Sequence, residues 1–304
     1  MSQRDVKNRI SSVKNIQKIT RAMEMVAAAR LRRAEQRIEH LRPYAEAIRR
    51  MTRTAAGAAE NIPHLPILKE HATQESVGLL LVTGDRGLAG AFNSQIIRAG
   101  LRAATEYEAA GQKVHFSATG RRGVSSLTFR GRELEGRYVG FTDRPAFADA
   151  RQIAEDLMVA YVDQKVDRVE IFYNGYISPL SQVVRRETLL PLQQASILGD
   201  DDLDVVEDAS DSATVNHARS LVEYEPDPEE ILKRLVPDYV EISVYRALLE
   251  STASEHGARM TAMRSASENA GEIIEDLTLE MNRARQAEIT QEIMEVVAGA
   301  EALT

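Results

Sequence analysis

The segment with the clearest potential for chemistry is the glycine-rich turn at residues 83–90 (TGDRGLAG), which follows an apolar run. In α/β folds such a turn can place backbone N–H groups around a phosphate. The glycines are spaced G-x-x-G-x-x-G, which is not the dinucleotide-binding pattern, and no Walker A Gly-Lys-Ser/Thr follows. An acidic ribose partner would fall at Glu106 or Glu108, inside an expected helix. We interpret the segment as a tight structural turn and keep nucleotide binding as the weaker alternative.

Other residues that could carry chemistry form no recognisable site. The six histidines are scattered, without an i, i+4 pair or an H-E-x-x-H motif, and there is no G-x-S-x-G elbow. The run Asp200–Asp202 could bind a cation weakly, but it lacks the glycine and the distal glutamate of a calcium loop. We therefore predict no catalytic residue, no metal and no cofactor, and a chain that is not itself an enzyme.

Composition excludes several classes of protein. The chain has 304 residues, 43% hydrophobic and 28% charged, enough for one or two domains with a core. Because cysteine is absent, disulfides and thiol chemistry are excluded. There is no apolar run of 18 residues, and residues 1–10 lack the apolar core of a signal peptide. We expect a chain that is not exported by the usual route.

Residues 1–58 are predicted to form one long helix. Their apolar residues recur with a mean step of about 3.5, the coiled-coil value. These positions are Val6, Ile10, Val13, Ile16, Ile19, Met23, Val26, Leu31, Ala34, Ile38, Leu41, Ala45 and Ile48. Pro43 predicts a kink or a break, because proline removes a backbone donor and clashes one turn back.

Residues 226–304 are predicted to form a second long helical region with a seam rich in alanine and methionine. No proline follows residue 237, and we expect the region to bend or restart at Pro237. Residues 1–53 contain 14 Lys or Arg and 5 Asp or Glu, whereas residues 227–304 contain 7 and 16. This opposite charge favours pairing of the two helices.

The middle of the chain, residues 76–225, is predicted to be a small, doubly wound (Rossmann-like) α/β domain. We expect an antiparallel pair where a short turn at Pro179 joins the last two strands. The expected strands are 76–83, 113–120, 167–178 and 181–192, and the expected helices are 94–111 and 148–164. Residues 200–211 hold seven acids and no base, which favours a solvated loop.

The basic first helix could bind nucleic acid, since clustered lysine and arginine suit phosphates. Aromatic residues are almost absent from that stretch, and the whole chain has a net charge of −8. We therefore expect no nucleic acid, and favour a protein partner with acidic loops.

Five blocks of sequence closely resemble the gamma subunit of F-type ATP synthases. They occur in the order of that family and span nearly the whole chain, although the acidic stretch near 193–220 is longer than the family pattern leads us to expect. The blocks are RISSVKNIQKITRAMEMVAAAR (9–30), TGDRGLAGAFN (83–93), YEPDPEEIL (224–232), ASEHGARMTAMRSASENA (253–270) and NRARQAEITQEIMEVVAGAEA (282–302). The tripeptide Arg42-Pro43-Tyr44, after the first block, shares the resemblance.

The resemblance implies a central rotor shaft. The two terminal helices would form an antiparallel coiled coil inside the hexamer of alpha and beta subunits, with the α/β domain beside the epsilon subunit and the c-subunit ring. The shaft would couple proton flow to ATP synthesis on the beta subunits and regulate ATP hydrolysis. The expected location is peripheral, on the cytoplasmic face of a bacterial plasma membrane, with membrane contact only through the complex.

The resemblance also implies four partner-binding residues. Met23 would lie near a loop of a beta subunit, and Arg285, Gln286 and Thr290 would lie on the upper shaft. Arg285 and Gln286 resemble the polar pair that meets a beta-subunit loop during rotation. The alternatives are a seam position for Met23 and a plain solvated face for the others. An independent coiled-coil scaffold or chaperone, and a nucleotide-binding α/β enzyme, are the competing classes of function.

Overall fold

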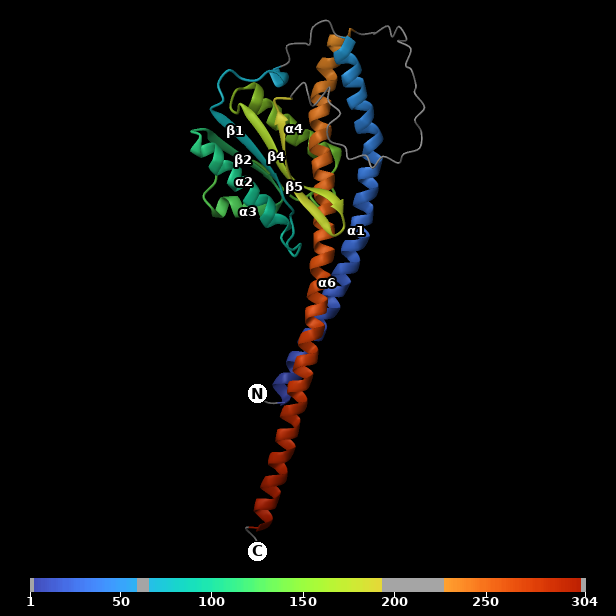
Figure 1. Ribbon diagram of the computed structural model, residues 1–304, viewed down its shortest axis with the longest axis vertical. Coiled ribbons are helices and arrows are strands. Elements are labelled where there is room, and N and C mark those ends of the chain that lie inside the picture. The colour runs from blue at the N-terminus through green and yellow to red at the C-terminus, as the bar shows by residue number, and fades with distance from the viewer. Residues whose placement is uncertain (1–2, 59–65, 193–226, 302–304) are drawn as a thin grey trace.

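Two long helices form the axis of the molecule. The computed structural model describes residues 3–58, 66–192 and 227–301 (Figure 1). Helix α1 (Gln3–Ala58) and helix α6 (Pro228–Glu301) lie side by side, and α6 continues well beyond the N-terminus of α1 (Figure 1). Their apolar contacts pair Val6 and Ile10 with Leu277, Leu31 and Ala34 with Ala253, and Ile48 with Leu235 and Ile242. The reversed order of these contacts makes the pair antiparallel, as expected.

Both helices continue through their prolines. Pro43 lies inside α1 and Pro237 inside α6, so α1 does not break and α6 does not restart. A proline removes one intrahelical hydrogen bond. Here the residues that flank it are held by tertiary contacts, as Val236 and Val240 show on either side of Pro237. Packing therefore overrides the local preference on which the expectation rested.

A five-stranded sheet forms the α/β domain, with strand order β3-β2-β1-β4-β5. Its strands are β1 (Ser76–Val82), β2 (Lys113–Thr119), β3 (Leu134–Tyr138), β4 (Arg168–Ser178) and β5 (Ser181–Leu190). The first four are parallel, and β5 pairs with β4 in the antiparallel direction that the Pro179 turn predicts. The doubly wound α/β architecture with its long antiparallel helices is confirmed.

Helices cover both faces of the sheet. The shorter elements are η1 (Pro66–Leu68), α2 (Phe92–Ala109), α3 (Arg121–Phe129) and α4 (Phe147–Val162). One core joins the sheet to α2 and α3 through residues such as Leu81, Ile96 and Leu127. The other core joins it to α4 and to the first part of α6, where Ile153 and Val240 are fully buried. Thus the first part of α6 completes the α/β domain on one side while it packs against the end of α1 on another.

Strand β3 and helix α3 were not expected from the sequence. Strand β3 is an edge strand of five residues whose burial alternates and whose outward positions are Glu135 and Arg137. It has no apolar run that would mark it as a buried strand. Helix α3 has only nine residues and contains Gly123, which weakens its helical pattern.

Two expectations lie outside the described residues: the acidic loop at 200–211 and the domain boundary at 225–226. The domain limits 1–58, 76–225 and 226–304 therefore stay predictions. No helix within the described ranges is both long and apolar enough to cross a membrane.

Candidate functional site

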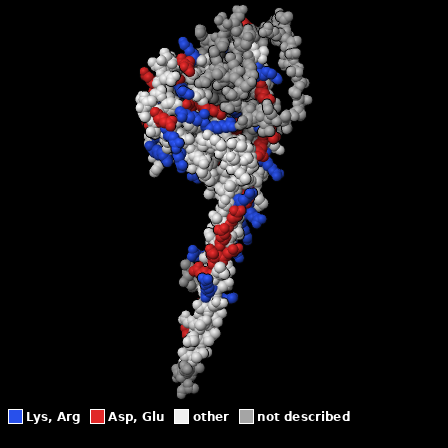
Figure 2. All heavy atoms as spheres, in the orientation of Figure 1, with Lys and Arg blue, Asp and Glu red and all other residues white. Residues whose placement is uncertain are grey.

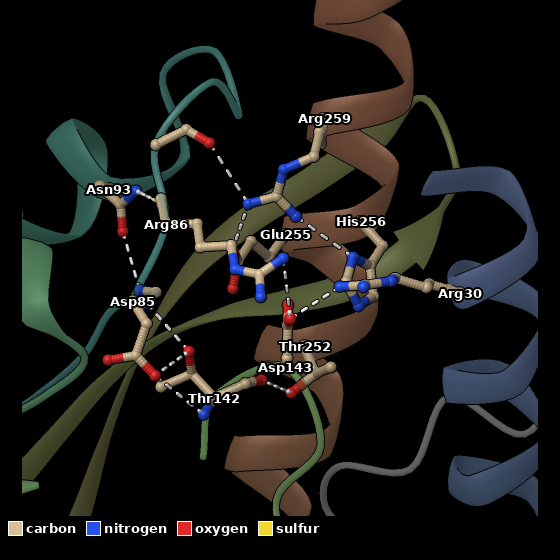
Figure 3. A network of polar contacts seen from close by, with 12 residues as sticks. Arg30, Asp85, Arg86, Asn93, Thr142, Asp143, Thr252, Glu255, His256 and Arg259 are labelled. Carbon is tan, nitrogen blue, oxygen red and sulfur yellow. Dashed lines mark hydrogen bonds and ion pairs between the residues drawn. The ribbon is translucent and has the colours of Figure 1, made fainter. Parts of the chain in front are cut away.

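The glycine-rich turn lies between the α/β domain and α6 (Figure 3). The Gly84 N–H donates to the Asn93 side-chain oxygen over 2.8 Å, and the Asn93 amide donates to the Arg86 carbonyl over 3.4 Å. Asn93 belongs to the first turn of α2, so this helix holds both sides of the bend. The turn is thereby fixed as part of the domain.

The Asp85 carboxylate collects the backbone donors around the turn. It accepts the N–H groups of Gly140 (2.9 Å), Arg121 (3.1 Å) and Thr142 (3.2 Å) and the hydroxyl of Thr142 (2.9 Å). Burial raises the pKa of Asp85, but these hydrogen bonds outweigh it and hold the pKa below its usual value. An ionised side chain of the turn thus binds backbone donors at the start of α3 and in the loop after β3, and so ties the turn to both.

A second carboxylate closes the other side of the turn. A Cβ added at Gly84 would lie 2.6 Å from a carboxylate oxygen of Glu255, so only glycine allows this approach. Arg259 donates to Glu255 over 2.5 Å and to the Gly87 carbonyl over 3.3 Å. Burial raises the pKa of Glu255, and the positive charge of Arg259 opposes that rise. The turn is packed against a buried ion pair, as a structural turn would be.

His256 is buried beside the same arginine. The Arg259 guanidinium lies 3.2 Å from His256 Nδ1, and since arginine only donates, Nδ1 accepts and the ring is neutral. Burial and the charge of Arg259 lower the pKa of His256 to about 4. The histidine is 1% exposed, so a proton on it would add a second buried cation.

The loop before α4 ties both long helices to the domain (Figure 3). Asp143 pairs with Arg30 of α1 over 2.6 Å and with Arg86 of the turn over 3.4 Å. The Thr252 hydroxyl of α6 donates to the Thr142 carbonyl over 2.9 Å. We call this set the polar junction; it consists of Arg30, Gly84, Asp85, Arg86, Asn93, Thr142, Asp143, Thr252, Glu255, His256 and Arg259. Its contacts join four separate segments of the chain into one body.

Comparison with known proteins places the whole chain in one family. A family model described as ATP synthase matches residues 2–303. The ATP synthase gamma chain of Rubrobacter xylanophilus is 41% identical over 302 residues, which cover 99% of this chain and 98% of the relative. The gamma chain of Streptomyces avermitilis is 42% identical, and the match covers 98% of this chain and 94% of that relative. The chain belongs to the ATP synthase gamma-chain family.

Solved structures agree with this membership in the gamma-chain family. The central stalk and c-ring structure of the Tetrahymena thermophila mitochondrial ATP synthase contains a chain that is 28% identical, with a TM-score of 0.58. It covers 82% of this chain and 99% of the other. A chain of the Euglena gracilis mitochondrial ATP synthase is 18% identical, with a TM-score of 0.68. The match covers 99% of this chain and 94% of the other, which shows the shared fold.

The four predicted partner-binding residues of this gamma-family chain lie at two levels of the shaft. Met23 is half-buried on α1, next to Glu24, which pairs with Arg264 of α6 over 2.9 Å. Arg285, Gln286 and Thr290 are exposed on α6, about 30 Å further along the axis at 1.5 Å per residue. The Thr290 hydroxyl donates to the Gln286 carbonyl over 2.8 Å. The structure does not bring Met23 together with the other three, and their roles stay predictions.

The polar junction, by contrast, was missed from the sequence apart from its glycine-rich turn. The junction residues of α6 lie inside the resembling block 253–270 or beside it: Thr252, Glu255, His256 and Arg259. Residues 252–259 hold five polar residues in eight positions, on a helix whose seam we expected to be apolar, and this density was the signal in the sequence. Among the described residues, no group of histidine and acidic side chains is arranged to hold a metal ion.

The Asp85 hydrogen bonds predict a large loss of stability when this carboxylate is removed. Asp85→Ala leaves the N–H groups of Gly140, Arg121 and Thr142 without their acceptor, so we expect the free energy of unfolding to fall by about 1–3 kcal/mol. Urea denaturation measures this. Asp163→Ala, at an exposed helix end, is the control and should change it by less than about 0.5 kcal/mol. Equal effects of the two substitutions would contradict the role given to Asp85.

Burial of neutral His256 predicts a pH-dependent stability. The unfolded chain binds a proton at His256 near pH 6.5, but the folded chain only near pH 4, so stability falls as the pH drops through this window. His256→Gln removes this dependence. When the pH falls from 7.5 to 5, the free energy of unfolding of the wild type should decrease by about 2 kcal/mol more than that of the variant. Urea unfolding at both pH values tests this, and parallel losses would refute the buried neutral state.

Proposed function

We propose that this chain is the rotor of an ATP synthase central stalk, which transmits rotation between an ion-driven membrane ring and the catalytic head. One observation carries the proposal: the first part of α6 packs in the core of the α/β domain, and the same helix continues along the shaft and projects beyond α1 (Figure 1). A torque applied to the domain therefore reaches the far end of the shaft through a single continuous helix.

The polar junction transmits this torque to the second helix as well. Arg30 of α1 pairs with Asp143, while Thr252 and Arg259 of α6 bind Thr142 and the glycine-rich turn. The loop before α4 thus holds both helices, and the glycine-rich turn adds a second contact to α6. Between the junction and the N-terminus of α1, the two helices are joined by apolar contacts and by the ion pair Arg264–Glu24. Neither helix can stay in place while the domain rotates unless these contacts break.

The outer surface of the shaft suits movement inside a sleeve. Met25 and Val26 are exposed on α1, and the end of α6 exposes Ile293 and Val296. On the face shown in Figure 2, the last part of α6 is largely uncharged. Flexible methionine and small side chains tolerate changing contacts. Exposed ion pairs with a partner would each contribute about 0–1 kcal/mol, which allows release during rotation.

The partners we infer are the alpha and beta subunits around the shaft, and the epsilon subunit and the c-subunit ring beside the α/β domain. ATP is then made on the beta subunits, and this chain carries out no chemistry of its own. The location we infer is the cytoplasmic face of a bacterial plasma membrane. What supports these assignments is the family, the bacterial relatives and the rigid link between shaft and domain.

The four partner-binding residues fit this arrangement. Arg285, Gln286 and Thr290 lie on the part of α6 that projects beyond α1, where a surrounding hexamer would meet them. Met23 lies nearer the domain, where a beta-subunit loop would reach the shaft. We propose that these residues contact the catalytic head in a rotation-dependent way.

Reconstitution tests the rotor proposal directly. The chain is mixed with purified alpha and beta subunits, and complex formation and ATP hydrolysis are measured together. We expect a stable complex whose hydrolysis requires this chain, and no hydrolysis by the chain alone. If no complex forms, the scaffold or chaperone alternative is favoured. Hydrolysis by the isolated chain would instead favour a nucleotide-binding enzyme.

Met23→Lys tests the contact with the beta subunit in the assembled ATP synthase. The substitution adds a cation beside an acidic partner loop, so it should impair coupling more than hydrolysis. Proton pumping and ATP hydrolysis are measured in one membrane preparation, and their ratio should fall. Met23→Leu keeps the size without the charge and should leave the ratio unchanged. A normal ratio in Met23→Lys would rule out this role for Met23.

A further inference from the structure

A cationic hollow lies beside the polar junction, between α1 and the loop before α4. Its volume is about 350 Å³, and it is lined by Arg30, Arg33, Ala34, Arg37, Asp143, Arg144 and His256. Four of the seven lining residues are arginines, whereas Asp143 is the one acid among them. Buried His256 forms part of the wall, and its ring is neutral as described above. The hollow is therefore strongly positive.

Three of these arginines have no anionic partner within the described part of the chain. Asp143 is taken by Arg30 and Arg86, at 2.6 Å and 3.4 Å, which leaves Arg33, Arg37 and Arg144 without an ion pair there. Arg30, Arg33 and Arg37 follow one another at three- and four-residue steps on one face of α1. Like charges at such steps destabilise a helix. An anion bound between them would remove this repulsion.

We propose that this hollow binds a small phosphate-bearing anion, either orthophosphate or the phosphate groups of an adenine nucleotide. Guanidinium groups bind phosphate oxygens through paired, charge-assisted hydrogen bonds. Arg33 and Arg37 approach the hollow from α1 and Arg144 approaches it from the loop before α4. The bound anion bridges the shaft to the α/β domain, in addition to the pair Arg30–Asp143. The site is separate from the glycine-rich turn, whose Asp85 carboxylate is held by the N–H groups of Gly140 and Thr142.

The shape of the site favours a small anion over an acidic peptide. The arginines line one concave space between α1 and the loop before α4, where a compact phosphate can meet donors from both. The exposed arginine Arg32 lies on the same helix but does not line the hollow. It offers a matched control, with the same charge on the same helix outside the site.

Calorimetric titration of the full chain tests the proposal. Orthophosphate is titrated at constant ionic strength, so that general screening does not change. We expect saturable binding to one site. In the double variant Arg33→Gln/Arg37→Gln the affinity should fall roughly tenfold or more, whereas Arg32→Gln should change it less than about twofold. The ring resonance of His256 should shift on binding in the wild type and in Arg32→Gln, but not in the double variant.

Further titrations identify the part of the ligand that is recognised. ADP binding at the same site with higher affinity than orthophosphate assigns the hollow to nucleotides, and equal affinity assigns it to phosphate alone. The proposal is overturned if phosphate binding does not saturate, if Arg32→Gln weakens it as much as the double variant, or if adenosine binds as well as ADP. An acidic peptide that binds where phosphate does not would equally overturn it. None of these outcomes bears on the rotor assignment, which rests on assembly with partner subunits.

Discussion

The structure depends on one contact, the packing of the Gly84 backbone against the buried carboxylate of Glu255. Burying an ionisable group is costly unless it is paired, and Glu255 is paired with Arg259, which also holds the Gly87 carbonyl. Loss of either charge would leave the other buried and unpaired, so the turn and the helix are fixed together. The glycines therefore serve a close approach of two protein segments. In other α/β proteins a glycine-rich turn can bind a phosphate, whereas here its glycine makes room for α6.

This contact makes the shaft and the α/β domain one mechanical body. The first part of α6 fills the core beneath the sheet, where Leu248 is buried, and the following turns carry Thr252, Glu255 and Arg259 into the polar junction. The same helix packs against α1 on both sides of the junction, at Leu235 and Ile242 before it and at Leu277 after it. Apolar packing fixes how deeply the helix lies against the sheet, whereas the directional hydrogen bonds of the junction fix its rotation about its own axis. A rotor needs both constraints.

The sequence predicted those parts of the fold that repeat along the chain. Heptad-like spacing identified α1, and apolar runs identified β1 and β4, because a periodic signal is local. The junction could not be predicted, since its contacts join residues far apart, such as Arg30 with Asp143 and Arg259 with Gly87. For the same reason the sequence left a break at Pro43 and a restart at Pro237 open: the continuity of each helix is decided by tertiary packing. The resemblance supplied the family, but not the contacts that hold the turn.

The net charges of the two helices explain less of their pairing than the sequence suggests. In the pair Glu24–Arg264 the acid comes from the basic helix and the base from the acidic one. Nor are Arg30, Arg33 and Arg37 neutralised by α6, because they face the hollow beside the loop before α4. Apolar and small residues hold α1 against α6 instead, in the clusters around Leu277 and Ala253. The excess positive charge of α1 is thus available to groups outside the pair of helices, which is where a shaft that turns among other subunits has use for it.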